Sequence, residues 1–242
     1  MTWSPASKAR LTGYDLARFP GDTLFDRVAR AVCAAGCLPR KELYEAWEIA
    51  RRVRRLVRGG PVVDVAGGHG LLAHLLLILD DTSPSAVVVD PAVPPSAAKV
   101  HAALLSAWPR LAGRVEYRRA GLDAPAIPPG ALLVSCHACG ALTDRVLDAA
   151  IAAGADVAVL PCCHDVETCD AGVLDGWMDA DLAIDALRAT RLAGHGYRVA
   201  TLAIPAAVTP KNRLLVGIAP HRTAAAGGRP RRAQRRPARP GA

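Results

Sequence analysis

Hydrophobic residues recur every three or four positions along two stretches near the start of the chain. The stretches are LFDRVARAVCAAGC, from residue 24, and RKELYEAWEIARRVRRLVRG, from residue 40. Pro39 lies between them, and Gly59 and Gly60 end the second. The spacing predicts two amphipathic helices, because it places apolar side chains on one helical face and because glycine commonly follows a helix end. We therefore expect residues 1–59 to form a helical N-terminal cap.

After Gly60 the pattern changes to short β-branched runs that alternate with helical stretches. The runs include PVVDVA, SAVVVD, ALLVSCH and DVAVLPCC, and they are apolar on both faces. Strands of this kind lie in a parallel sheet that is covered by helices. The last two runs, YRVATLAI and RLLVGIAP, have only about eight residues between them, so they pair as an antiparallel hairpin, because a parallel return needs a dozen or more. The predicted fold of residues 60–221 is therefore α/β and Rossmann-like, with an antiparallel last strand.

The first of these strands ends in a glycine-rich turn, DVAGGHG. Gly67, Gly68 and Gly70 have no Cβ atom, so a ligand can approach the backbone closely. In open α/β sheets the first strand-to-helix turn commonly supplies the ligand site. Gly68, Gly70 and Ala73 match the G-x-G-x-x-A pattern of dinucleotide enzymes. Asp90 then ends the second strand, where such an enzyme holds a ribose, so the spacing alone allows NAD as the cofactor.

Asp64, taken with the glycines and the terminal hairpin, resembles the D-x-x-x-G-x-G motif and the layout of class I S-adenosylmethionine-dependent methyltransferases. The resemblance implies that Asp64 lies near the amino-acid end of the cofactor and that Asp90 binds the ribose hydroxyls. It also implies that Asp123, in the loop after the third strand, holds the adenine amino group. A plain turn residue is the alternative for Asp123.

Cysteines and histidines gather at the ends of the fourth and fifth predicted strands. They are Cys136, His137, Cys139, Cys162, Cys163 and His164. The carboxyl ends of parallel strands share one edge of a sheet, so we expect both groups to converge beside the glycine turn. The pattern resembles the H-x-C-G…T-D…C-C of a methyltransferase branch that includes the eukaryotic tRNA acceptor-stem 2′-O-methyltransferase and the methyltransferase domain of the glutathione-S-transferase C-terminal-domain-containing protein.

Three interpretations of these thiols stay open. Small, polarisable thiols pack well against a sulfonium, and in this interpretation Cys136 lines the cofactor and no metal is present. Alternatively, the thiols and imidazoles ligate zinc, or one cysteine adds to a pyrimidine ring as a nucleophile. We expect the first. The candidate acid–base groups at the same edge are His137, His164 and Lys211, the last from the segment TPKNRLLVG.

The positive charge of the chain is concentrated near its end. The formal net charge is +8, but seven arginines and no acid lie within residues 222–242, which leaves +1 for the rest. That segment is rich in proline, glycine, alanine and arginine, so we expect a disordered basic tail. A second basic group, on the second predicted helix, consists of Arg51, Arg54, Arg55 and Arg58. Both groups suit RNA as a partner through its phosphates, and a solvated surface is the alternative for each.

The cysteine count and the length of the apolar runs indicate the cellular compartment and bear on membrane contact. Seven cysteines, an odd number, and the lack of a secretory segment indicate free thiols in a reducing compartment, the cytoplasm. The longest apolar run is shorter than the roughly 20 residues of a membrane span, so we expect no membrane contact. We predict S-adenosylmethionine-dependent methyl transfer, with RNA, and tRNA first, as the acceptor. The alternatives are an NAD(P)-dependent oxidoreductase, a methyltransferase acting on a protein or small molecule, and a non-catalytic module that binds cofactor or RNA.

Overall fold

The computed structural model describes residues 3–122 and 127–225. Its strands are β1 (Val62–Val65), β2 (Ala86–Asp90), β3 (Val115–Arg119), β4 (Leu132–Ser135), β5 (Asp156–Val159), β6 (Arg198–Ala203) and β7 (Arg213–Ile218). Its α-helices are α1 (Leu24–Ala35), α2 (Arg40–Leu56), α3 (Leu71–Leu79), α4 (Ala97–Ala107), α5 (Ala141–Ala153), α6 (Ala180–Gly194) and α7 (Pro220–Ala225), with short 3-10 helices at Gly13–Arg18, Pro109–Leu111 and Gly172–Leu174. Over the described residues, no helix is both long enough and apolar enough to cross a membrane.

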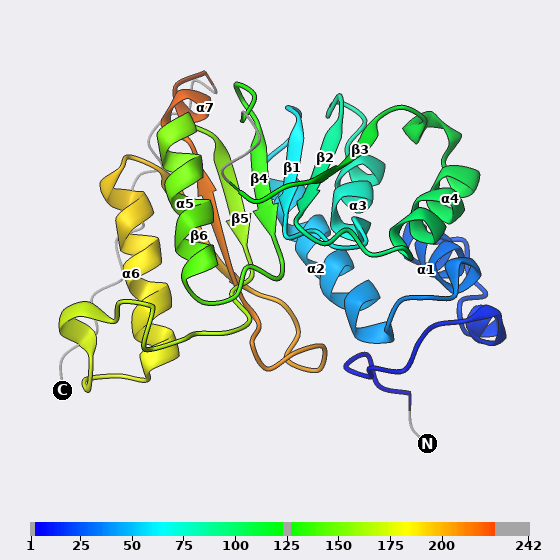
Figure 1. The fold of residues 1–242 in the computed structure, drawn as a ribbon, viewed down its shortest axis with the longest axis horizontal. Helices are drawn as coiled ribbons and strands as arrows, with labels where there is room; N and C mark the ends of the chain where they lie inside the picture. Colours follow the sequence, from blue (N-terminus) through cyan, green and yellow to red (C-terminus); the bar gives the residue numbers. More distant parts are fainter. Residues whose placement is uncertain (1–2, 123–126, 226–242) are drawn as a thin grey trace, which may run out of the picture.

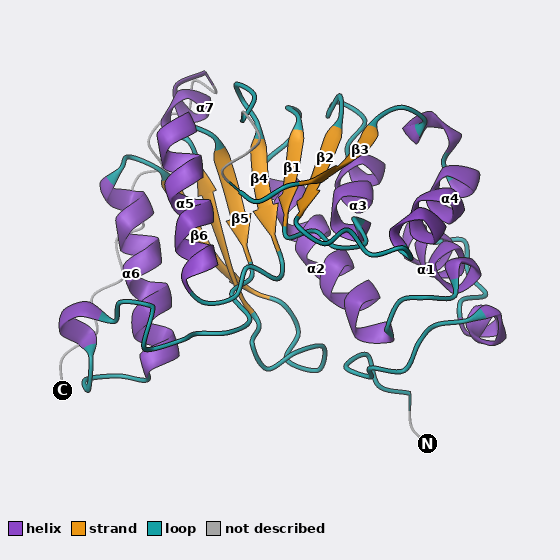
Figure 2. Ribbon diagram, in the orientation of Figure 1, coloured by secondary structure: helices purple, strands orange, loops and turns teal. Residues whose placement is uncertain are grey.

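The strands form one seven-stranded sheet in the order β3-β2-β1-β4-β5-β7-β6. β1 to β5 pair in parallel, and β7 lies antiparallel between β5 and β6. The strands run side by side through the molecule and helices flank them (Figure 2). This arrangement confirms the predicted α/β, Rossmann-like sheet and its antiparallel last strand.

Separate hydrophobic cores cover the two faces of the sheet. Val62 of β1 belongs to the core that includes α1 to α4, and its neighbour Val63 belongs to the core that includes α5. Successive side chains of a strand point to opposite faces, so both faces of β1 are apolar. Along the sheet, α1 to α4 lie toward the β3 side and α5 and α6 toward the β6 side (Figure 1).

The N-terminal helices are part of the first core. Thr23 caps α1 by accepting a hydrogen bond from the Asp26 backbone N–H at 3.1 Å, and Gly36, with φ of 64°, follows its end. Leu43 and Ile49 of α2 are buried in the same cluster as α3. Helices α1 and α2, which lie within the predicted cap, thus belong to the core that covers one face of the sheet.

Arg54 was expected on a basic surface that contacts RNA, and this is wrong. Its side chain is only 2% exposed. It donates to the Leu76 carbonyl at 3.1 Å and to Ser83 Oγ at 2.7 Å, and it pairs with Asp80 at 3.3 Å. Burial lowers the pKa of Arg54 to about 10. Its role is to hold α2 against the end of α3.

The basic tail also begins later than the expected residue 222. Arg222 lies in α7, where its Nε pairs with the fully buried Asp156 at 2.6 Å and its guanidinium donates to the Gly130 carbonyl at 2.9 Å. These contacts fix α7 against the amino ends of β4 and β5. The rest of the predicted tail, 226–242, lies outside the described residues.

Candidate functional site

The glycine turn lies directly after β1, and its three glycines serve two purposes. A Cβ on Gly67 would lie 2.7 Å from Asp64 Cγ, and one on Gly70 would lie 2.8 Å from the Tyr117 hydroxyl. These two glycines let the turn pack tightly against the sheet. Gly68, with φ of 49°, would meet nothing within 4 Å, so its open side is the one that faces a ligand. We expected all three glycines to make room for a ligand, and the packing of the turn against Asp64 and Tyr117 gives Gly67 and Gly70 a second role.

The Asp64 side chain is hydrogen-bonded to the first turn of α3. The residue is 1% exposed, and its Oδ2 accepts a hydrogen bond from the Ala73 backbone N–H in the first turn of the helix at 3.2 Å. Burial raises the pKa of this carboxyl group to about 7, with a smaller contribution from the charge of Asp90. The amino end of α3 is therefore already bonded to an acidic side chain of the protein.

Asp90 ends β2 beside the open glycine, as predicted. Its Oδ2 accepts from the Gly68 backbone N–H at 3.0 Å, and its Oδ1 accepts from Ala92 N–H at 2.8 Å. The side chain is half-buried, so it is fixed in place and still accessible from one side. Asp123, the third predicted carboxylate of the cofactor site, lies outside the described residues.

A cavity of about 230 Å³ opens at this edge of the sheet. It is lined by Glu42, Ala46, Asp64, Ala66, Gly67, Gly68, His69, Leu71, Leu72, Cys136 and His137. Two carboxylates face it, and none of the described residues that line it is a lysine or arginine. The cavity is therefore suited to a ligand that carries positive charge.

The contribution of α2 to this cavity was not predicted. Glu42 and Ala46 come from the amino-terminal half of that helix, and burial raises the pKa of Glu42. In the sequence these residues are ordinary positions of an amphipathic helix. No local signal marks them, because they reach the cavity only through the packing of α2 onto α3.

The predicted cysteines separate into two groups. Cys136 lies on the cavity, is buried, and has a pKa raised well above its ordinary value by that burial. It is thus a neutral thiol that lines the cavity, as expected. Cys139, Cys162 and Cys163 form a different cluster, in which the Sγ atoms of Cys139 and Cys162 are 3.1 Å apart.

Of the three predicted acid–base groups, only His137 lines the cavity. Its ring lies with the Cys136 thiol and the buried Glu45 carboxylate in a group whose polar atoms are all within 4.8 Å of one another. Glu45 in turn pairs with Lys41 at 3.2 Å. Burial lowers the pKa of His137, and the nearby Glu45 carboxylate offsets this lowering only in part.

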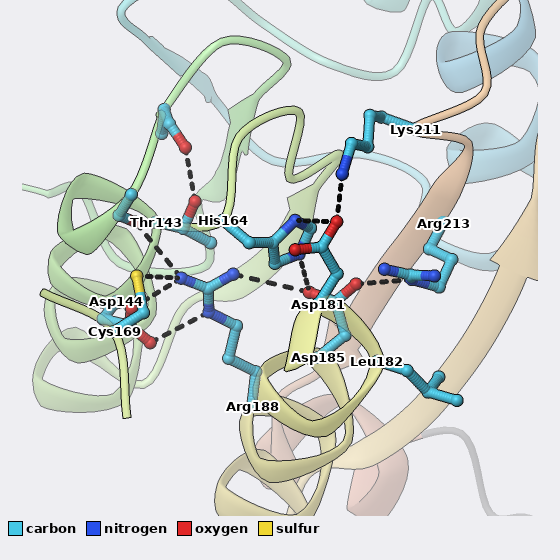
Figure 3. A network of polar contacts seen from close by, with 12 residues as sticks. Thr143, Asp144, His164, Cys169, Asp181, Leu182, Asp185, Arg188, Lys211 and Arg213 are labelled. Atoms are coloured by element: carbon cyan, nitrogen blue, oxygen red, sulfur yellow. Dashed lines mark hydrogen bonds and ion pairs between the residues drawn. The ribbon is translucent and has the colours of Figure 1, made fainter. Parts of the chain in front are cut away.

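His164 and Lys211 do not line the cavity but belong to a network of ionic contacts on α6 (Figure 3). The His164 side chain is 1% exposed, with Nε2 2.7 Å from Asp185 Oδ1 and Nδ1 3.5 Å from Asp181 Oδ2. Lys211 contacts the same Asp181. The structure thus brings these two predicted residues together, yet it places them apart from His137.

No protein-family model matches the sequence, and no curated protein matches it either. Several solved structures of methyltransferases are similar to it. An O-methyltransferase family protein from Burkholderia thailandensis is 18% identical, with 88% of this chain and 65% of that chain covered and a TM-score of 0.49. The S-adenosylmethionine-dependent methyltransferase SibL, in its apo form, is 20% identical, with 87% and 66% covered and a TM-score of 0.49. The ribosomal protein L11 methylase of Lactobacillus delbrueckii subsp. bulgaricus is 14% identical, with 74% and 78% covered and a TM-score of 0.45.

The chain thus spans slightly less than two thirds of the first two structures.

Proposed function

We propose that this protein binds S-adenosylmethionine and transfers its methyl group to an acceptor. The main support for the proposal is the hydrogen bond that Asp64 accepts from Ala73 N–H at the amino end of α3. In dinucleotide-binding folds the pyrophosphate occupies the amino end of this helix and bonds to the backbone N–H groups of the turn. Here Asp64 accepts from Ala73 N–H and Asp90 accepts from Gly68 N–H. A phosphate bound at the helix end would have to displace the Asp64 carboxyl group, which disfavours NAD(P), whereas the position of Asp90 suits the ribose of either cofactor.

The charge of the cavity supports the same cofactor. S-adenosylmethionine carries a sulfonium cation, and Asp64 and Glu42 face the cavity without a lysine or arginine among the described lining residues. Asp90 keeps one side accessible at the end of β2, a position suited to ribose hydroxyls. The neutral, polarisable Cys136 thiol can pack against the sulfonium.

In the transfer step the protein has to hold the acceptor in line with the activated methyl group, because the leaving group is already a sulfonium. An acceptor hydroxyl also has to lose its proton. We assign that role to His137, which lies on the cavity beside Glu45. His164 is held by two carboxylates elsewhere and has no part in the step.

Calorimetric titration tests the cofactor assignment. S-adenosylhomocysteine, the product of methyl transfer, is expected to bind with a micromolar dissociation constant, and Asp90→Ala is expected to weaken that binding at least about tenfold, or about 1.4 kcal/mol. Asp22→Ala, an exposed aspartate outside the cavity, serves as the matched control and should leave the affinity unchanged. Tight binding of NADH, with no heat from S-adenosylhomocysteine, would overturn the assignment.

As the acceptor we propose RNA, with tRNA first, in line with the motif resemblance around Cys136 to Cys163. The support is the net charge of +8 and the exposed side chains of Arg55 and Arg58. Arg55 lies in the last turn of α2, 13 residues or about 20 Å along the helix from Glu42, and Arg58 follows the helix end. An RNA that contacts them and reaches the cavity therefore has to extend along α2.

Transfer of a radiolabelled methyl group to pooled tRNA, protein and small metabolites tests the acceptor. Label in the tRNA pool is expected, and removal of residues 226–242, which carry six arginines, should weaken RNA binding and reduce its salt dependence. Label only in protein or metabolites would contradict the RNA proposal without affecting the cofactor. Cofactor binding with no labelled product in any pool would indicate a non-catalytic module.

We also propose a cytoplasmic location for the protein. All seven cysteines are free thiols in the structure. Free thiols that include exposed Cys139 and Cys163 persist in a reducing compartment.

A further inference from the structure

Three thiols converge outside the cavity, at the carboxyl ends of β4 and β5. Cys139 follows β4, and Cys162 and Cys163 follow β5. Cys162 Sγ is 3.1 Å from Cys139 Sγ and 3.7 Å from Cys163 Sγ, and all three sulfur atoms lie within 4.8 Å of one another. Two loops, whose residues Cys139 and Cys162 are 23 positions apart in the chain, thus bring three sulfur atoms close together.

The spacing of the three sulfur atoms matches the demands of a thiolate-bound metal. Tetrahedral zinc has Zn–S bonds of about 2.3 Å, which place its sulfur ligands about 3.8 Å apart. The separations of 3.1 and 3.7 Å are slightly shorter than that value, and the third is no longer than 4.8 Å, so small side-chain rotations suffice to bring all three sulfur atoms to one ion. Three protein ligands leave the fourth position of the tetrahedron for water or another small ligand.

An ion can reach this cluster from solvent. Cys139 and Cys163 are exposed, and Cys162 is half-buried. A disulfide would use two of the thiols and leave the third without a partner. A thiophilic cation is the ligand that uses all three.

The loop that carries Cys139 is fixed by two backbone hydrogen bonds of the next residue, Gly140. Gly140 N–H donates to the Cys163 carbonyl at 3.0 Å, which ties the two thiol loops together. Gly140 has φ of 57° and ψ of −135°, a conformation that favours glycine. Its carbonyl accepts from Arg188 Nη2 at 3.1 Å, and Arg188, 2% exposed, is itself held by Asp144 (Figure 3).

The loop that carries Cys162 and Cys163 is fixed by the next residue, His164. Its ring lies between Asp181 and Asp185 of α6. Asp185 also contacts Arg188 at 3.4 Å and Arg213 at 2.6 Å. One network on α6 thus anchors both thiol loops, as outer-shell contacts do around metal sites.

We propose that Cys139, Cys162 and Cys163 form a three-thiolate site for Zn²⁺. The site is separate from the cofactor cavity and does not rest on the proposed methyl transfer. The ionic network of Figure 3, which includes the buried His164 and Arg188 side chains, is its outer shell and holds the two loops in place.

Cobalt substitution tests the site in the full-length protein. The chain is purified with a chelator and a phosphine reductant, the chelator is removed, and Co²⁺ is titrated. One Co²⁺ per chain is expected, with an intense thiolate-to-cobalt charge-transfer band and the visible bands of tetrahedral cobalt, and Zn²⁺ should displace it. Cys139→Ser and Cys163→Ser should each remove the bands and weaken Zn²⁺ binding by more than the roughly 10–100-fold that the loss of an outer-shell partner costs.

The controls separate this site from its alternatives. Cys37→Ser, a half-buried thiol outside the cluster, should keep the bands. Cys139 and Cys163 are exposed, so their serine variants should show the wild-type circular dichroism and thermal melt of the metal-free protein. Bands that persist in both variants, or that vanish in Cys136→Ser instead, would place the metal elsewhere and overturn the proposal. So would reduced protein that binds no Co²⁺ but forms a Cys139–Cys162 disulfide in air.

Discussion

Asp64 is the residue on which the choice of cofactor depends. Its carboxyl group has a pKa of about 7 because it is buried, and without a ligand it is largely protonated at pH 6. A cation bound beside it favours the carboxylate form. Binding of a cationic cofactor should therefore release a proton from Asp64.

This coupling predicts how binding depends on pH. The affinity for S-adenosylmethionine should rise as the pH rises through 7 and then become constant, and the Asp64→Asn variant should bind more weakly with no such rise. Calorimetry at pH 6 in two buffers of different ionisation enthalpy measures the released proton directly. Equal heats in both buffers for the wild-type protein would contradict the coupling.

In the unliganded protein, a rise in pH lowers the contribution of Asp64 to stability, whereas it strengthens cofactor binding. The folded-state pKa of Asp64 lies above the unfolded value of about 3.9, so its contribution to the free energy of unfolding falls as the pH rises from about 4 toward 7. Asp64→Asn should lack this fall. Asp22→Asn, at an exposed position, should retain it.

At the scale of elements, α6 determines where the loops after β4 and β5 lie. Arg188 is 2% exposed and contacts Asp144 of α5 at 2.6 Å, Asp185 at 3.4 Å and the Gly140 carbonyl at 3.1 Å. Removing it takes a buried partner from Asp144 and Asp185, which are 31% and 12% exposed. Arg191, one turn later on α6, also lies 3.9 Å from Asp144, but its side chain is about a third exposed.

The two arginines therefore form a matched pair. Arg188→Met should lower the free energy of unfolding by about 3–5 kcal/mol, and Arg191→Met should lower it by about 1 kcal/mol or less. Urea unfolding of the metal-free variants at pH 7.5 measures both. Equal, small effects would show that the network in Figure 3 does not hold the loops as described.

At the scale of the whole molecule, the sheet could be predicted from the sequence, because the burial and the direction of its strands follow from short stretches of the chain. Four-residue strands such as β1 and β4 are buried throughout, which the apolar runs indicated. The antiparallel pairing of β6 and β7 followed from the short link between them. Asp64 and Asp90 were placed correctly at the ends of their strands for the same reason.

The arrangement of side chains around the cavity could not be predicted in the same way. His137 and His164 both follow a strand, yet one lines the cavity and the other turns toward α6, where Asp181 and Asp185 hold it. Those partners lie about 20 residues further along the chain, and no local pattern links them to His164. Glu42 reaches the cavity through the packing of α2 for a similar reason.

The most direct test of the proposed cofactor is a crystal structure of the protein grown with S-adenosylhomocysteine, compared with one grown with NADH. We expect S-adenosylhomocysteine in the cavity, with its ribose at Asp90. The hydrogen bond from Ala73 N–H to Asp64 should remain. A nicotinamide dinucleotide in that cavity, with its pyrophosphate on the first turn of α3 and Asp64 displaced, would contradict the proposal.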